Sequence, residues 1–325
     1  MTPFTRAELE AAAETVYAAM RPTPHYAWPL LGRRFGAEVW VKHENHTPIG
    51  AFKVRGGLVY LDRMKREGRA PGVVSATRGN HGQSLAYAGR RLGVPVTVLV
   101  PHGNAREKNA AMRAWGAELV EHGRDFDAAR IRAAEIAAER GLEMVPPFDR
   151  DLVLGVASYA LELFTEVPDL DAVYVPIGCG SGICGLIAVR DLLGLSTEIV
   201  GVVSAGAPAY ARSFAAGRAV ETARALTFAD GMAVRVPVPG ALDLILGGAA
   251  RVVEVGDDAV AEAIRAFHED THNLAEGAGA APLAALARER DAMRGRRVAV
   301  ILSGGNIDRA WAAEVLAGRT PRPDG

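Results

Sequence analysis

The chain has 325 residues, which is long enough to build two α/β lobes around separate cores. Its 37 Lys and Arg residues nearly balance 38 Asp and Glu residues, so there is no basic excess to suggest a nucleic-acid partner. Two cysteines, Cys179 and Cys184, are too few for a disulfide framework or a tetrahedral zinc site. The apolar runs are too short to span a membrane, and residues 1–20 lack the features of a signal peptide, so we expect a cytoplasmic protein.

Short β-branched runs alternate with helical patterns along the whole chain. Helices are predicted near the N-terminus and at residues 81–92, 105–115 and 125–140. Strands are predicted at residues 39–42, 72–76, 96–100, 118–121, 172–177, 198–204, 252–255 and 297–302. This alternation predicts an α/β fold with mostly parallel sheets flanked by helices.

In such sheets the ligand lies beyond the carboxyl ends of the strands. Three unusual loops directly follow predicted strands, at residues 75–83, 176–185 and 302–306. The segment 46–57 is a fourth candidate.

The fourth candidate contains Lys53 between Phe52 and Val54, close to Gly50, Gly56 and Gly57. A lysine in this position could be a solvated residue on a helix face. Alternatively, burial and the neighbouring Arg55 could lower its pKa and leave a free amine for a Schiff base.

The loop after the strand at 72–76 reads Thr77-Arg78-Gly79-Asn80-His81. Gly79 permits a tight bend, and the amides before the next helix could bind a carboxylate. The simpler interpretation is a strand-to-helix turn with Asn80 as the N-cap.

The loop after the strand at 172–177 reads Gly178-Cys179-Gly180-Ser181-Gly182 and opens a helix. Its glycines allow successive N–H groups to converge on a phosphate. The sequence is not a Walker loop. It is also a poor dinucleotide site, because Ser204 stands where an acidic residue would be needed for the ribose.

Ser303 follows the last predicted strand, where its hydroxyl could bond a ring nitrogen or merely cap a turn.

Taken together and in this order, the four segments resemble the fold-type II pyridoxal-phosphate (PLP) enzymes, the tryptophan-synthase-β-like superfamily. The branch of serine/threonine dehydratases and serine racemases is the most similar. The resemblance runs from Thr23 to Asp308. It implies a two-lobed fold with a large PLP-binding domain at residues 1–71 and 149–325 and a small inserted domain at 72–148. It also implies a homodimer.

The resemblance assigns the site residues as well. Lys53, beside Phe52, matches the lysine that forms the Schiff base and takes the α-proton. The amides of Thr77, Arg78, Gly79, Asn80 and His81 match the site of the substrate carboxylate. The remaining matches to cofactor contacts are Asn80 at the ring hydroxyl, Gly178, Cys179, Gly180, Ser181 and Gly182 at the phosphate, Ser303 at the ring nitrogen, and Glu276 near the cofactor.

The chain departs from this branch at three places. Arg78 replaces the serine that shuttles a proton in racemases, and a guanidinium cannot do so; it could pair with a substrate carboxylate, brace the loop or face solvent. Ser204, Pro208 and Tyr210 stand where the branch binds a divalent cation, and two carboxylates are missing, so we expect no metal there. The phosphate loop is interrupted by Cys179 and Ser181, which weakens any transfer of fine substrate specificity.

The expected activity is therefore a PLP-dependent ammonia-lyase that converts L-threonine, L-serine or a larger 3-hydroxy amino acid to a 2-keto acid and ammonia. The alternatives are a related lyase of ectoine breakdown, a β-replacement enzyme and a non-catalytic PLP-binding protein. The chain ends soon after Ser303, so we expect no regulatory domain and a catabolic role.

Overall fold

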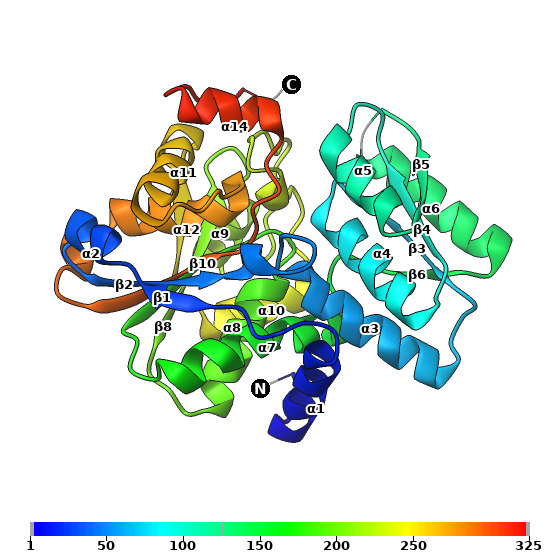
Figure 1. Ribbon diagram of the computed structural model, residues 1–325, viewed down its shortest axis with the longest axis horizontal. Helices are drawn as coiled ribbons and strands as arrows, with labels where there is room; N and C mark the ends of the chain where they lie inside the picture. The colour runs from blue at the N-terminus through cyan, green and yellow to red at the C-terminus, as the bar shows by residue number, and fades with distance from the viewer. Residues whose placement is uncertain (1–2, 125, 323–325) are drawn as a thin grey trace.

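The computed structural model describes residues 3–124 and 126–322, which are arranged around two sheets (Figure 1). The larger sheet has the strand order β1-β2-β10-β7-β8-β9. Its strands are β1 (His25–Ala27), β2 (Glu38–His43), β7 (Ala172–Pro176), β8 (Glu198–Ser204), β9 (Arg251–Val255) and β10 (Arg297–Leu302). All neighbouring pairs are parallel except β1 and β2, which are antiparallel.

The smaller sheet has the order β5-β4-β3-β6, and all of its neighbouring pairs are parallel. Its strands are β3 (Val73–Ala76), β4 (Val96–Val100), β5 (Glu118–Glu121) and β6 (Glu143–Met144). We call this sheet and its helices α4, α5 and α6 the small lobe, and the rest the large lobe. The small sheet lies within residues 72–148, where an inserted domain is predicted.

Helices cover both sheets. In the first half of the chain they are α1 (Arg6–Tyr17), α2 (Pro29–Phe35), α3 (Lys53–Glu67), α4 (Asn80–Leu92), α5 (Arg106–Ala114), α6 (Phe126–Arg140) and α7 (Arg150–Glu166). In the second half they are α8 (Ser181–Leu192), α9 (Ala209–Ala216), α10 (Pro239–Gly248), α11 (Asp257–Thr271), α12 (Gly277–Arg288), α13 (Arg290–Met293) and α14 (Arg309–Leu316). Two 3-10 turns, η1 (Glu44–His46) and η2 (Asp230–Met232), complete the list.

The central strands of the large sheet are apolar on both faces. In β10, Val298 and Val300 are buried in one hydrophobic cluster, whereas Ala299 and Ile301 belong to another on the opposite face. Helices α11, α12 and α14 lie on one side of this sheet, and α7, α8 and α10 lie on the other (Figure 1). This two-sided burial explains why the strands read as continuous apolar runs.

The predicted α/β architecture with mostly parallel, helix-covered sheets is confirmed. Strands β1 and β6 were not predicted, since three and two residues are too few to display a pattern. The helix predicted at residues 125–140 corresponds to α6, which is described from Phe126 onwards. Residue 125 lies outside the described residues. Within the described residues, no helix combines the length and hydropathy needed to cross a bilayer.

Candidate active site

The segment 46–57 lies directly on the loop that follows β10. Ala51 forms an antiparallel bridge with Gly304, and the Phe52 N–H donates to the Ser303 carbonyl at 3.0 Å. The Gly305 N–H donates in turn to the Gly50 carbonyl at 2.9 Å. Two of the four candidate segments are thereby joined through their backbones.

Lys53 is the first residue of α3, and its Nζ lies 3.2 Å from Ser181 Oγ at the start of α8. The same Nζ lies 5.1 Å from the centroid of the Phe52 ring. Burial lowers the pKa of Lys53, as expected, and a nearby Cys179 opposes the shift only in part. The carbonyl of Lys53 accepts a hydrogen bond from Ser84 Oγ at 2.6 Å, which holds the start of α3 against α4. An amine with a lowered pKa is the form that can attack a carbonyl carbon.

The expectation that Arg55 contributes to this shift is wrong. Arg55 is fully buried and turns away from Lys53, with Nε 2.7 Å from Glu44 Oε2 and an Nη atom 2.6 Å from Glu162 Oε1. Lys42 completes the network by donating to Glu162 Oε2 at 2.5 Å. Because two carboxylates neutralise the two cations, Arg55 presents no free positive charge to Lys53, and desolvation alone lowers its pKa.

Residues 178–180 form a tight loop after β7, and Ser181 and Gly182 open α8. A Cβ at Gly178 would collide with the carbonyl oxygen of Gly231, and one at Gly180 would lie 2.6 Å from the Ala241 Cβ. Gly180 also has a φ of 100°, which favours glycine. The first N–H groups of α8 have no partner within the helix, so this loop can bind an anion.

Two tyrosines, Tyr210 and Tyr159, support this loop in roles that the sequence did not indicate. The Tyr210 hydroxyl donates to the Cys179 carbonyl at 3.3 Å and accepts from the Val238 N–H at 3.0 Å. The Tyr159 hydroxyl donates to the Gly182 carbonyl at 3.0 Å. Both tyrosines lie outside the glycine loop in the sequence, so no local pattern predicts these roles.

The loop after β3 leads directly into α4, which begins at Asn80. Thr77 Oγ1 accepts from the Gly79 N–H at 3.0 Å, and the helix cap at Gly79 has no side-chain hydrogen bond, so Asn80 is not the N-cap. His81 is buried, and its burial together with the charge of Lys53 lowers the pKa of the imidazole to about 3. Arg78 is exposed and makes no ion pair with the described residues.

The Asn80 side chain reaches into the large lobe. Its Nδ2 donates to Glu276 Oε1 at 2.6 Å, just before α12. Glu276 is 3% exposed, and its Oε2 has no hydrogen-bond partner among the described residues. Burial raises the pKa of Glu276 to about 7, although Lys108, with Nζ 3.9 Å from Oε2, opposes the shift.

Ser303 is buried at the end of β10. The residues weighed as metal ligands serve local structure instead: Ser204 Oγ accepts from the Gly206 N–H at 3.1 Å, and Tyr210 supports the glycine loop. Among the described residues, no group of three or more His, Cys, Asp or Glu side chains is arranged to hold a metal ion.

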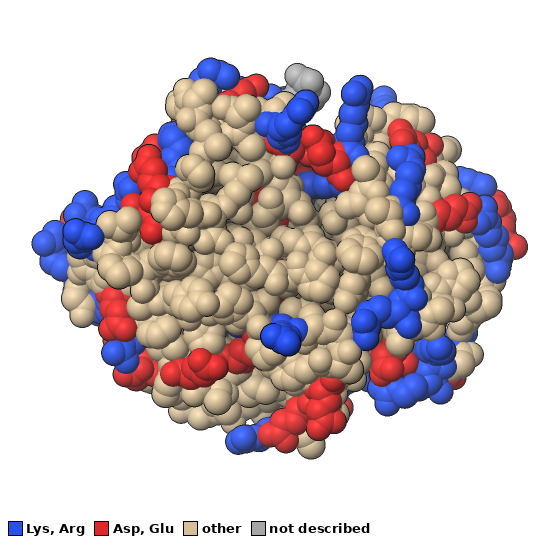
Figure 2. Space-filling view, viewed as in Figure 1, with Lys and Arg blue, Asp and Glu red and all other residues tan. Residues whose placement is uncertain are grey.

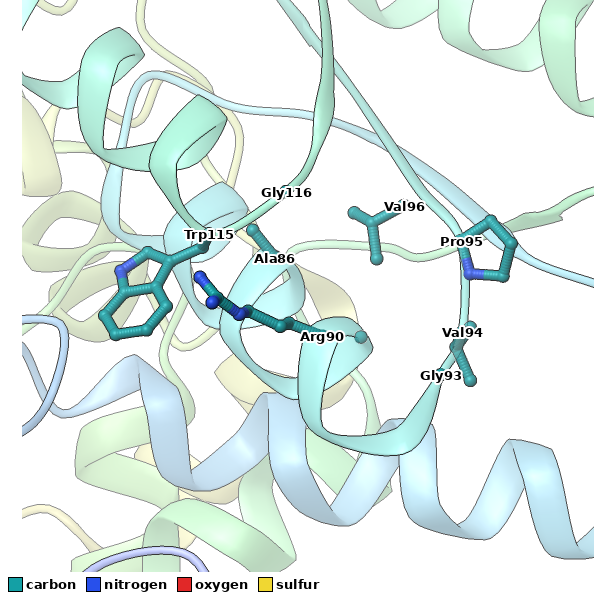
Figure 3. A pocket seen from close by; sticks show the side chains of 9 residues that line it. Ala86, Arg90, Gly93, Val94, Pro95, Val96, Trp115 and Gly116 are labelled. Atoms are coloured by element: carbon teal, nitrogen blue, oxygen red, sulfur yellow. The ribbon is translucent and has the colours of Figure 1, made fainter.

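A separate cavity of about 380 Å³ lies on the small lobe, between the end of α4, the start of β4 and the end of α5 (Figure 3). Arg90 and Trp115 form its polar and aromatic walls, and Val94, Pro95 and Val96 line the apolar side. None of its lining residues belongs to the four candidate segments. The ends of strands and the starts of helices in the candidate segments meet instead around Lys53.

Comparison with known proteins finds a matching family model, similar sequences and similar structures. The model of the family described as "Pyridoxal-phosphate dependent enzyme" matches residues 16–304. The L-threonine ammonia-lyase of Geobacter sulfurreducens is 37% identical over 95% of this chain and 76% of its own length. The biosynthetic L-threonine dehydratase of Salmonella typhimurium is 32% identical over 94% of this chain, which spans only 59% of that protein. The structure of the processed form of threonine deaminase isoform 2 from Solanum lycopersicum superposes with a TM-score of 0.88 at 29% identity, covering 97% of this chain and 95% of that one.

Proposed function

We propose that this chain, which belongs to the family of pyridoxal-phosphate dependent enzymes, is an ammonia-lyase. Its substrate is a small 3-hydroxy amino acid such as L-threonine or L-serine, and its products are a 2-keto acid and ammonia. The observation that carries the proposal is the position of Lys53, an amine of lowered pKa that lies 3.2 Å from the hydroxyl at the start of α8.

The residues present fit this cofactor. Lys53 provides the amine for covalent attachment, and Gly178 and Gly180 leave room that a Cβ would fill. The phosphate is assigned to residues 178–182, where Ser181 adds a hydroxyl to the helix start. Asn80 is assigned to the ring hydroxyl and Ser303 to the ring nitrogen. Phe52 and Glu276 complete the surroundings of the ring.

When bound, the cofactor withdraws electrons from the α-carbon of the substrate and so weakens its bond to hydrogen. The amides of residues 77–81 bind and orient the substrate carboxylate. Lys53 Nζ would take the α-proton of the substrate, which requires the neutral amine that burial favours. Ser303 would offer the ring nitrogen a neutral hydroxyl and not a charged partner, a pairing that suits elimination better than reactions that need a stronger electron sink.

Arg78 favours elimination over racemisation. A guanidinium is protonated at all working pH values and cannot accept and return a proton on the opposite face of the substrate. Since Arg78 is exposed and makes no ion pair with the described residues, it is available to a substrate that carries a second carboxylate.

The test is an assay of the purified protein with PLP, measuring keto acid and ammonia from a panel of 3-hydroxy amino acids. Release of both in equal amounts supports the lyase. Product that forms only when a nucleophile such as sulfide is added would instead support β-replacement. Visible cofactor absorbance without turnover would indicate a binding protein.

We further propose that the protein is a cytoplasmic homodimer. Cys179 and Cys184 are both free thiols, which suits a reducing compartment. The face shown in Figure 2 has a broad central area almost without charged side chains, where β1 and β2 lie in Figure 1. Tyr26 on β1 and Leu30 on α2 are exposed, at 53% and 42%. A second copy of the chain would cover such a face, and sedimentation equilibrium would measure the mass.

A further inference from the structure

Asn306 connects three of the four candidate segments through one side-chain amide. Its Nδ2 donates to the Ile49 carbonyl at 2.8 Å and to Asn80 Oδ1 at 2.8 Å. Its Oδ1 packs against Gly50, where an added Cβ would lie only 2.8 Å away. Gly50 has a φ of 69°, so glycine is favoured there on both backbone and steric grounds.

The orientation of this amide is determined by a group that cannot be reversed. A backbone carbonyl only accepts hydrogen bonds, so Ile49 requires the NH₂ end of Asn306 to face it. The second hydrogen of the same NH₂ group then requires the oxygen end of Asn80. The NH₂ end of Asn80 consequently faces Glu276 Oε1, which accepts from it at 2.6 Å.

This orientation matters because the two ends of an asparagine amide have opposite hydrogen-bonding character. Asn80 Nδ2 has two hydrogens, and Glu276 uses one of them. The second remains for another acceptor. A 180° rotation of the amide would offer an oxygen instead and would repel an anionic acceptor.

We propose that Asn306 is a positioning residue that sets the orientation of the Asn80 amide, so that Asn80 donates to the cofactor's ring oxygen. The inference rests on the assignment of Asn80 in the proposed function. Asn306 acts only through Asn80 and touches no reacting atom. Glu276 holds the other end of the amide.

The test is a double-mutant cycle on the PLP-loaded protein, read out by the cofactor's dissociation constant and visible spectrum. Asn306→Ala and Asn80→Ala should each weaken cofactor binding, by about tenfold for the loss of one hydrogen bond to a charged group. In the Asn80→Ala background, Asn306→Ala should have no further effect. Independent, multiplicative losses from the two substitutions would overturn the proposal.

Asn306→Asp sharpens the test because it keeps the size of the side chain and removes the donor. The new carboxylate should attract Asn80 Nδ2 and turn the Asn80 oxygen towards the ring, which shifts the cofactor's absorbance and the pH at which it titrates. Arg309→Ala is the matched control, since Arg309 is exposed at the start of α14 and should leave the spectrum unchanged. An unchanged spectrum in Asn306→Asp would also overturn the proposal.

These readouts separate the two proposals. Cofactor binding and absorbance do not require turnover, so a protein that binds PLP without releasing keto acid would refute the lyase and still test Asn306. If Asn306→Ala does not fold, as judged by circular dichroism, Asn306→Ser serves in the same cycle. An Asn80→Ala variant with normal cofactor affinity and spectrum would refute the role proposed for Asn306 and leave the proposed lyase activity unaffected.

Discussion

Lys108 of α5 and Asp230 of η2 form an ion pair across the two lobes, with Nζ 2.5 Å from Oδ2. Although the burial of Lys108 opposes the shift, the carboxylates of Asp230 and Glu276 raise the pKa of its ammonium group. The Lys108 stem also packs on the site, because a Cβ at Gly79 would lie 2.5 Å from Lys108 Cδ. One buried lysine thus joins the small lobe, the large lobe and the loop assigned to the substrate carboxylate.

Lys108→Met should destabilise the protein by about 2 kcal/mol, because Asp230 is left without its partner in a partly buried position. Lys108→Met combined with Asp230→Asn should recover much of this loss. Urea unfolding of the single and double variants measures both effects. If the losses in free energy of unfolding of the two single variants simply add in the double variant, the pair does not couple the lobes.

Glu276 should make stability depend on pH. The pKa of its carboxyl is 4.5 in an unfolded chain and about 7 here, so between these values the folded protein holds a proton that the unfolded chain has lost. Stability from this group is therefore complete below pH 4.5 and is lost as the pH rises towards 7 and above.

Glu276→Gln removes this titration, so a comparison with the wild type separates the contribution of Glu276 from that of the other carboxylates. Relative to the wild type, the free energy of unfolding of the variant should rise by about 3 kcal/mol between pH 5 and pH 8. Chemical unfolding of both holoproteins across this range measures the difference. A difference that stays constant with pH would contradict the raised pKa.

Lys53→Ala should abolish turnover and the visible absorbance of the bound cofactor. The physical reason is that the Lys53 amine is the one that contacts the start of α8 among the residues that the structure describes, with Nζ 3.2 Å from Ser181 Oγ. Lys65→Ala is the control, since Lys65 is exposed on the same helix. Borohydride reduction followed by peptide mapping should place the cofactor on Lys53, and a label found on another lysine would refute the assignment.

Arg78→Ala should change substrate preference and leave the fold intact. The side chain is exposed and makes no ion pair with the described residues, so the free energy of unfolding should change by less than about 0.5 kcal/mol. The KM for threo-3-hydroxyaspartate, which carries a second carboxylate, should rise about tenfold, whereas that for threonine should not. Equal KM values for both substrates in the variant and the wild type would place Arg78 outside the pocket.

The order of strands and helices was readable from local patterns, because apolar periodicity and turn residues act over a few positions. The loops after β3, β7 and β10 were identified for the same reason, whereas Lys53 beside Phe52 was singled out through the resemblance of the four segments to a known family. Strand β1 escaped prediction because its three residues are defined by pairing with β2, and not by their own pattern.

Local patterns therefore specify the succession of elements and the segments in which chemistry can occur. Which partner each side chain meets depends on the tertiary packing. It directed Arg55 away from Lys53 towards Glu44 and Glu162, and it brought Glu276 to Asn80 across 196 positions of the chain. Such contacts depend on how helices pack on two separate sheets, and packing of that kind leaves no periodic trace in the order of residues.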